Sequence, residues 1–334
     1  MKKQLLIAAV AATMTSAAMA DISISGDAKF EYQNVETTGV AINVNQTNTE
    51  VNLKLRGKSG DTTVVMDIAA NGGATASTAA GVTAISGTVV EDMYLTTKVG
   101  DVTVKGGNYS TGTSAILGEI ENGGRANNKV TLSGSTGGVS WYAGNSATVG
   151  TGATQINGNM FVGASMDVAG WKVQAKHNSA TVDSFGISGE VSGVGIRLEQ
   201  KNDTAANGDT TFGNVTYSTN GIDLAYAWLD SDKANQIDED DSAIFAVENG
   251  IVTATTDTGN AQITAKTSVA GNTVTVKSGS VENGIATGTD LDYTQIAVSR
   301  PLASGATFAA TYTDKDDSAT TDTQILELDL SVKF

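Results

Sequence analysis

Within the last eleven residues, Gln324 to Phe334, apolar and polar side chains alternate strictly from Leu326 onward. The apolar positions are Leu326, Leu328, Leu330, Val332 and Phe334. Successive side chains of a β-strand point to opposite faces, so this period of two predicts a strand with one apolar and one polar face. The same alternation recurs in Ile22–Tyr32 and Thr49–Arg56. We therefore expect a chain built from two-faced strands.

Connections between the alternating runs are short and long by turns. Short ones contain glycine, as at 57–61 and 219–221, whereas long ones include 71–88, 110–127 and 231–289. Bacterial outer-membrane barrels have short turns at one end and long loops at the other. No apolar run approaches the roughly 18 residues that a membrane-spanning helix needs. The sequence thus predicts an all-β fold, a transmembrane antiparallel β-barrel of about sixteen strands.

Residues 231–289 have two interpretations. An acidic run at 238–241 and a Thr-rich composition favour one long external loop. Alternatively, 263–269 and 273–276 form a hairpin around Gly271 and Asn272, which would raise the strand number to about eighteen. We favour the loop, because apolar residues are too few here for a lipid-facing surface.

The N-terminus has the three parts of a secretory signal peptide. Lys2 and Lys3 form a basic region, residues 5–13 an apolar region, and Ala18-Met19-Ala20 a cleavage site. We expect residues 1–20 to be removed and residues 21–334 to form the barrel. Cleavage leaves 18 basic and 36 acidic residues, a formal charge of −18, which argues against nucleic acid as a partner.

Catalytic and metal-binding motifs are weak or absent in this sequence. There is no cysteine, and the one histidine, His177, has no recognisable catalytic partners, so we expect no enzyme and no cofactor. Acidic pairs at Asp238, Asp240, Asp314 and Asp316 could bind Ca²⁺. A solvated acidic loop is the better interpretation, since their spacing does not match a closed coordinating loop.

Charged residues occupy the face of the strands opposite the apolar one. They include Lys29, Lys54, Arg56, Lys105, Lys129, Lys176, Asp67, Asp92 and Glu199. A lysine or arginine facing lipid at mid-bilayer costs about 2–4 kcal/mol, so these side chains need water on their side of the wall. A barrel of about sixteen strands leaves such an aqueous channel.

The aromatic last residue, Phe334, resembles the closing strand of Gram-negative outer-membrane barrels, in which this segment is read by the barrel-assembly machinery. With the Ser25–Ala28 opening strand and the order of loops, residues 21–334 resemble the sixteen-stranded general diffusion porins. That resemblance implies a homotrimer in the bacterial outer membrane, in contact with lipid and lipopolysaccharide. It also implies that the 110–127 loop, the third external one, folds inward and narrows the pore.

The resemblance assigns candidate residues to this constriction. Glu119 and Glu121 would form its acidic side, and Lys29, Lys54 and Arg56 its basic side on the wall. The sequence lacks the P-E-F-G-G segment of the enteric members and has a less arginine-rich wall. These departures leave the width and the selectivity of the pore open.

The expected function is passive diffusion of ions and small hydrophilic solutes, with a weak preference for cations given the acidic charge. A solute-specific channel on the same barrel is the alternative, with inward Tyr94, Tyr142 and Tyr293 as its scattered aromatic residues. A secreted adhesin or β-solenoid is a third class, but it requires an internal repeat of fixed period, which we do not find.

Overall fold

The computed structural model describes residues 21–39, 44–76, 87–109, 126–146, 159–179, 182–203, 208–232, 257–283, 290–317 and 321–334. These residues form a single sheet of 18 strands. The first nine are β1 (Asp21–Thr37), β2 (Val44–Ser59), β3 (Thr62–Ala76), β4 (Gly87–Val99), β5 (Val102–Tyr109), β6 (Ala126–Thr136), β7 (Val139–Ser146), β8 (Asn159–Val168) and β9 (Trp171–Asn178). The others are β10 (Val182–Val191), β11 (Val194–Asp203), β12 (Gly208–Thr219), β13 (Ile222–Ser231), β14 (Asp257–Val269), β15 (Asn272–Asn283), β16 (Leu291–Pro301), β17 (Ala306–Asp317) and β18 (Thr321–Lys333).

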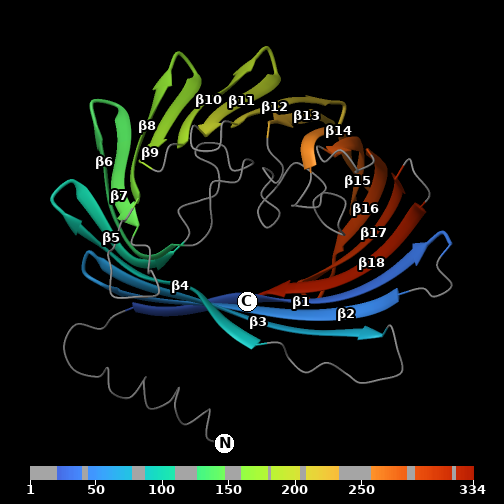
Figure 1. Ribbon diagram of the computed structural model, residues 1–334. Coiled ribbons are helices and arrows are strands. Elements are labelled where there is room, and N and C mark those ends of the chain that lie inside the picture. The colour runs from blue at the N-terminus through green and yellow to red at the C-terminus, as the bar shows by residue number, and fades with distance from the viewer. Residues whose placement is uncertain are drawn as a thin grey trace, which may run out of the picture.

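The sheet closes on itself into a barrel (Figure 1). Every strand pairs antiparallel with its neighbours in the sequence, and β1 pairs with β18 over the register Asp27↔Lys333 to Thr37↔Thr323. Closure leaves no unpaired sheet edge. A bilayer would not tolerate such an edge, because hydrocarbon offers the free backbone groups no hydrogen-bond partner. The predicted all-β antiparallel barrel is confirmed. No helix within the described residues is long and apolar enough to cross a membrane.

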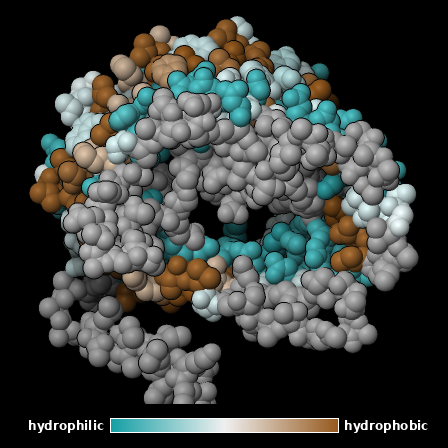
Figure 2. All heavy atoms as spheres, viewed as in Figure 1, coloured by the Kyte–Doolittle hydropathy of each residue, from teal (hydrophilic) through white to brown (hydrophobic). Residues whose placement is uncertain are grey.

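The two faces of the wall differ in polarity as the alternation predicts. On β18, Leu326 and Leu330 are 40% and 46% exposed on the outer face, whereas Glu327 between them is 3% exposed on the inner face. Figure 2 shows hydrophobic side chains mostly on the outside of the ring and hydrophilic ones facing its centre. The outer face is therefore suited to hydrocarbon and the inner face to water.

The short connections lie at the end of the barrel that also holds Asp21 and Phe334. In five of them two successive residues have positive φ: Gly137-Gly138, Ala169-Gly170, Ser192-Gly193, Asn220-Gly221 and Ala270-Gly271. This backbone shape is that of the tight hairpin turn whose twist matches the flanking strands. The long connections lie at the opposite end.

The strand number corrects the expectation of about sixteen. The predicted external loop 231–289 contains β14 and β15, which pair with each other and with β13 and β16. Their outer faces hold Ala265, Thr267 and Ser278 beside Ile263 and Val276, an alternation too weak to favour strands over a loop, and the alternative of a hairpin around Gly271 and Asn272 is confirmed. Backbone pairing, rather than a strongly apolar face, keeps them in the wall. Residues 1–20, 233–256 and 284–289 lie outside the described residues.

Phe334 completes the junction between the first and last strands. Its N–H donates to the carbonyl oxygen of Gly26 at 2.9 Å, and its own carbonyl oxygen accepts from the Gly26 N–H at 2.8 Å. The ring lies over Gly26, where a Cβ atom would stand 3.0 Å from the nearest ring carbon and 2.3 Å from the Asn52 carbonyl oxygen. Only glycine fits at this position.

Candidate channel wall

Inward-facing charges gather in two regions of the wall. One lies where β1 meets β18, and the other extends from β4 to β11. In a ring of 18 strands, β9 stands nine strands from β18 and so lies across the barrel from it, whereas β5 stands only five strands from β18. Each is held on paired strands, whose side-chain directions are set by register rather than by loop conformation.

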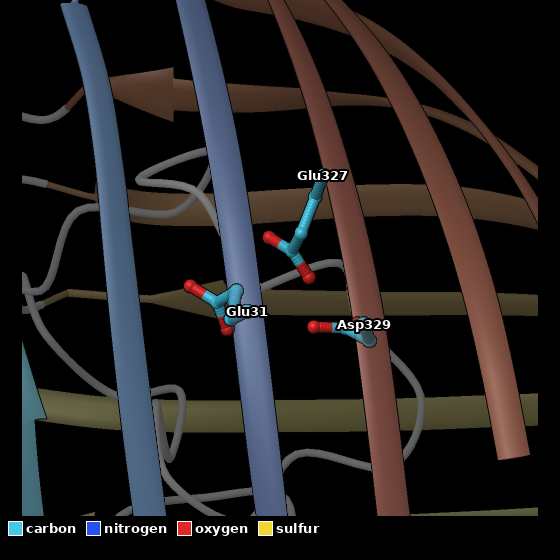
Figure 3. Close-up of side chains that lie close together, drawn as sticks. All are labelled: Glu31, Glu327 and Asp329. Atoms are coloured by element: carbon cyan, nitrogen blue, oxygen red, sulfur yellow. The ribbon is translucent and has the colours of Figure 1, made fainter.

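The first region is a carboxylate cluster formed by Glu31, Glu327 and Asp329. Figure 3 shows the side chains of Glu327 and Asp329 on β18 turned toward Glu31 on β1. One oxygen of each lies within 4.8 Å of the others. Lys29 Nζ is 2.8 Å from Glu31 Oε2 and 3.4 Å from Asp329 Oδ1. The pairings Glu31↔Asp329 and Gln33↔Glu327 bring these groups together.

This cluster combines three carboxylates with one ammonium group. Carboxylate oxygens are the ligands that hard cations prefer. However, the Lys29 ammonium group already pairs with two of the three side chains, so we interpret the cluster as an internally compensated acidic patch rather than as a metal site. Within the group itself, three carboxylates outnumber the one ammonium group.

The second region combines lysines with tyrosines. Lys105 Nζ on β5 lies 3.8 Å from the ring centroid of Tyr94 and 3.9 Å from that of Tyr109. The two rings meet edge to face, with centroids 5.7 Å apart. Lys129 Nζ on β6 lies 5.6 Å from the Tyr109 centroid, and it is in the electrostatic field of Lys176 on β9.

Hydrogen bonds and cation–π contacts fix this lysine–tyrosine wall. The hydroxyl oxygens of Tyr109 and Thr131 are 2.6 Å apart. An ammonium group over an aromatic face gains about 0.5–2 kcal/mol and keeps N–H groups for another partner. Lys129 and Tyr109 are each 2% exposed, so the groups of this wall that an organic anion could reach are the partly exposed Lys105, Tyr94 and Lys176.

The three residues predicted to form the basic side of the pore have different surroundings in the structure. Lys29 belongs to the carboxylate cluster, and Lys54 Nζ is 3.1 Å from Asp67 Oδ2 on the neighbouring strand. Arg56 lies two residues after Lys54 on β2, so its side chain faces the same inward side of the strand. Glu119 and Glu121 lie outside the described residues, so the predicted constriction stays a prediction. The same holds for the other residues of the 110–125 segment.

Three other residues singled out in the sequence, His177, Asp314 and Asp316, lie on the outer face. His177 Nδ1 is 2.6 Å from Asp183 Oδ1, and both side chains are exposed near the long-connection end. Asp314 and Asp316 follow Tyr312 on the outer face of β17, and neither belongs to a group of three ligand-type side chains within the described ranges. Asp238 and Asp240 are outside those ranges.

Sequence reasoning missed the carboxylate cluster and the role of Tyr109. Glu31, Glu327 and Asp329 have the expected inward parity, but their meeting depends on the closing register between the two ends of the chain. An antiparallel alignment of the first and last strands would have indicated it. Tyr109 follows a register shift in the β5–β6 pairing between Gly107 and Tyr109, which no local pattern reveals.

No known family model and no curated protein sequence matches this chain. Solved structures share its fold. OccK11 (OpdR) of Pseudomonas aeruginosa has a TM-score of 0.65 and 14% identity, covering 94% of this chain and 96% of its own. OccAB4 of Acinetobacter baumannii has a TM-score of 0.64 and 9% identity, covering 94% and 98%. Pseudomonas aeruginosa OpdK, solved with vanillate, has a TM-score of 0.63 and 12% identity, covering 93% and 98%. At such identities the likeness shows the fold.

Proposed function

We propose that this protein is a porin of the bacterial outer membrane, through which ions and small hydrophilic solutes diffuse passively. The observation that carries the proposal is the closed 18-stranded wall with an apolar outer and a charged inner face. Barrels of 16 to 18 strands leave an aqueous channel, whereas about eight strands are filled by side chains. The architecture thus supports an exported protein that spans a membrane and encloses water.

Reconstitution of the mature chain, residues 21–334, tests this function. In planar bilayers we expect stepwise ohmic conductance, and in detergent we expect migration on a gel that changes on heating. A chain that stays soluble without detergent, or that inserts but never conducts, would contradict the proposal.

A solute-selective channel is the second candidate, and the lysine–tyrosine wall favours it. Lys105 and Lys176 are partly exposed, with Lys105 over the ring of Tyr94, whereas Lys129 and Tyr109 are each 2% exposed. A small organic anion with an aromatic ring could exchange ionic and stacking contacts with such a wall. OpdK, which shares the fold, has been solved with vanillate, an anion of this kind. We therefore propose aromatic carboxylates as preferred solutes.

The lysine–tyrosine wall is tested by Lys105→Met with Lys129→Met. We expect the weak cation preference of the parent to increase, and millimolar vanillate to reduce the parent's ionic current more than that of the variant. Lys172→Met is the matched control, because Lys172 is an exposed lysine of inward parity on β9. Equal vanillate effects on all three proteins would exclude this wall as the selective element.

Two further proposals come from the sequence resemblance to the sixteen-stranded general diffusion porins, from which this barrel departs in having 18 strands. The constriction proposal predicts that Glu119→Gln with Glu121→Gln shifts the reversal potential toward anions, and that Lys54→Ala with Arg56→Ala shifts it toward cations. The homotrimer proposal draws support from the small, smooth outer face at the start of β1, formed by Ile22, Ile24, Gly26 and Ala28. Crosslinking in detergent that stops at monomers would contradict it.

A further inference from the structure

Lys105 differs from two other lumen-facing lysines in what holds its ammonium group. Lys29 pairs with two carboxylates, and Lys54 pairs with one. Lys105 Nζ lies instead against two aromatic rings, 3.8 Å from the ring centroid of Tyr94 and 3.9 Å from that of Tyr109. The rings meet edge to face, so together they form an open cage around this one ammonium group.

This cage leaves the hydrogen-bonding capacity of Lys105 unused. Within the residues that the structure describes, no hydrogen bond or ion pair occupies its ammonium group, and Asp67 and Asp92 act on it through their electrostatic field. An ammonium group has three N–H donors, and an aromatic face attracts its charge without accepting them as a carboxylate does. Lys105 is also partly exposed. Its charge is thus held in place and still open to an anion from the lumen.

The two rings of the cage are fixed in different ways. Tyr94 lies beside Gly107, where an added Cβ would stand 2.9 Å from the Tyr94 Cβ. Tyr109 is 2% exposed, and its hydroxyl oxygen is 2.6 Å from that of Thr131. Thr131 is the register partner of Lys105 across the β5–β6 pairing. The hydroxyl pair therefore ties the Tyr109 ring to the level of the wall at which Lys105 stands.

We propose that Tyr109 and Thr131 are positioning residues for Lys105, the side chain that contacts an anionic solute. Tyr109 is too deeply buried to touch a solute, and the Thr131 hydroxyl is engaged by Tyr109, so both act through Lys105. The identity of the solute rests on the proposed solute-selective function, whereas the position of the lysine does not.

The gain from positioning is entropic. A lysine has a flexible four-carbon stem, and a solute that binds a freely moving lysine must immobilise it. The cage immobilises Lys105 beforehand. Without the Thr131 hydroxyl, the Tyr109 ring is no longer tied to this level, and the lysine loses one of its two ring contacts. Loss of one cation–π contact corresponds to an affinity about fivefold weaker.

NMR of the mature chain in detergent, with its lysines dimethylated by ¹³C-formaldehyde, reads the position of Lys105 directly. Lys105→Arg identifies its signal. Ring currents shield a group that lies over an aromatic face. We therefore expect the Lys105 methyl signal at higher field than that of Lys172, which is an exposed lysine of β9.

Removing either hydroxyl of the pair tests the positioning. Thr131→Val and Tyr109→Phe should each move the Lys105 signal toward that of Lys172, whereas Thr131→Ser should leave it in place. Thr216→Val is the matched control, because Thr216 is an exposed, inward-facing threonine of β12. Should Thr131→Val not fold, Tyr109→Phe breaks the same contact from the other side.

Planar-bilayer recordings connect this position to solute binding. The vanillate concentration that halves the ionic current should rise about fivefold in Thr131→Val and in Tyr109→Phe. The double variant should show no further rise, because both substitutions break one contact. Thr131→Ser and Thr216→Val should match the parent.

Three results would overturn the positioning role. They are a parent whose Lys105 signal is not shifted from that of Lys172, a shift that survives the loss of either hydroxyl, and hydroxyl variants that are less stable in urea but equally blocked by vanillate. The two proposals fail separately. A shift that both hydroxyl variants lose, without vanillate block of any protein, refutes the solute alone, whereas equal block of parent and variants refutes the positioning alone.

Discussion

Replacing Lys29 by methionine tests whether the carboxylate cluster is held together by its one ammonium group. Methionine keeps most of the length and apolar character of the lysine stem and removes the charge. In the parent, Lys29 Nζ contacts Glu31 and Asp329 at 2.8 and 3.4 Å. In the variant, the three carboxylates of Glu31, Glu327 and Asp329 face one another without it.

The size of the effect follows from the geometry. Two unit charges 4.8 Å apart repel by about 3.5 kcal/mol at an effective dielectric constant of about 20. The side chains of Lys29, Glu31 and Asp329 are 32%, 22% and 16% exposed, so solvent screens part of this repulsion. We expect Lys29→Met to lower the free energy of unfolding by about 2 kcal/mol.

Urea unfolding of the vesicle-inserted protein, followed by tryptophan fluorescence, measures this loss. Adding Glu327→Gln removes one of the three repelling charges and should restore about half of it. Lys172→Met should change the free energy of unfolding by less than about 0.5 kcal/mol. A Lys29→Met barrel as stable as the parent, or no recovery on adding Glu327→Gln, would refute the electrostatic reasoning.

Three other outcomes are expected. Gly213→Ala should destabilise the barrel by about 1–3 kcal/mol in the same urea assay, because its Cβ would stand 2.0 Å from the Trp228 ring. Gly57→Ala is the control and should be tolerated, because no atom lies within 4 Å of the added Cβ. Tyr293→Phe should cost about 1 kcal/mol, since its hydroxyl donates to Gln262 Oε1 at 2.8 Å in a buried position, and exposed Tyr217→Phe should cost less. Deleting 257–283 should abolish heat-modifiable folding, because it removes two wall strands; a deletion variant that still inserts would show that the barrel can close without them.

Side-chain direction was the most predictable part of this fold. A residue of a membrane barrel faces either lipid or lumen, so a period of two in hydropathy fixes its direction. The inward parity of Lys105, Lys129 and Tyr142, and the outward parity of Ile22 and Leu330, were assigned correctly for this reason. The number of strands was not, because β14 and β15 alternate threonine, serine and alanine with few larger apolar residues.

The charge clusters were less predictable, because parity says which face a residue occupies but not which residues meet. Glu31 meets Asp329 through the pairing that closes the barrel, and Lys54 meets Asp67 through the β2–β3 register. Register shifts also displace residues within one strand pair, as between Asp67 and Ile68 on β3. The lysines expected on the basic side of the pore were therefore recognised as inward, but the pairing of Lys29 with Glu31 and Asp329, and of Lys54 with Asp67, was not.

Register in this wall is reinforced by glycines within the strands. In the middle of strands, a ring from the neighbouring strand lies where a Cβ would be: Tyr142 at Gly163, Phe161 at Gly144, Trp228 at Gly213 and Phe334 at Gly26. A slip of one residue would turn each ring away from its glycine and carry every inward charge to the lipid face. Aromatic residues are few in this chain, yet these rings resist such a slip. The same packing that stabilises the barrel thus sets which charges face the lumen, and with them the field that a permeating ion meets.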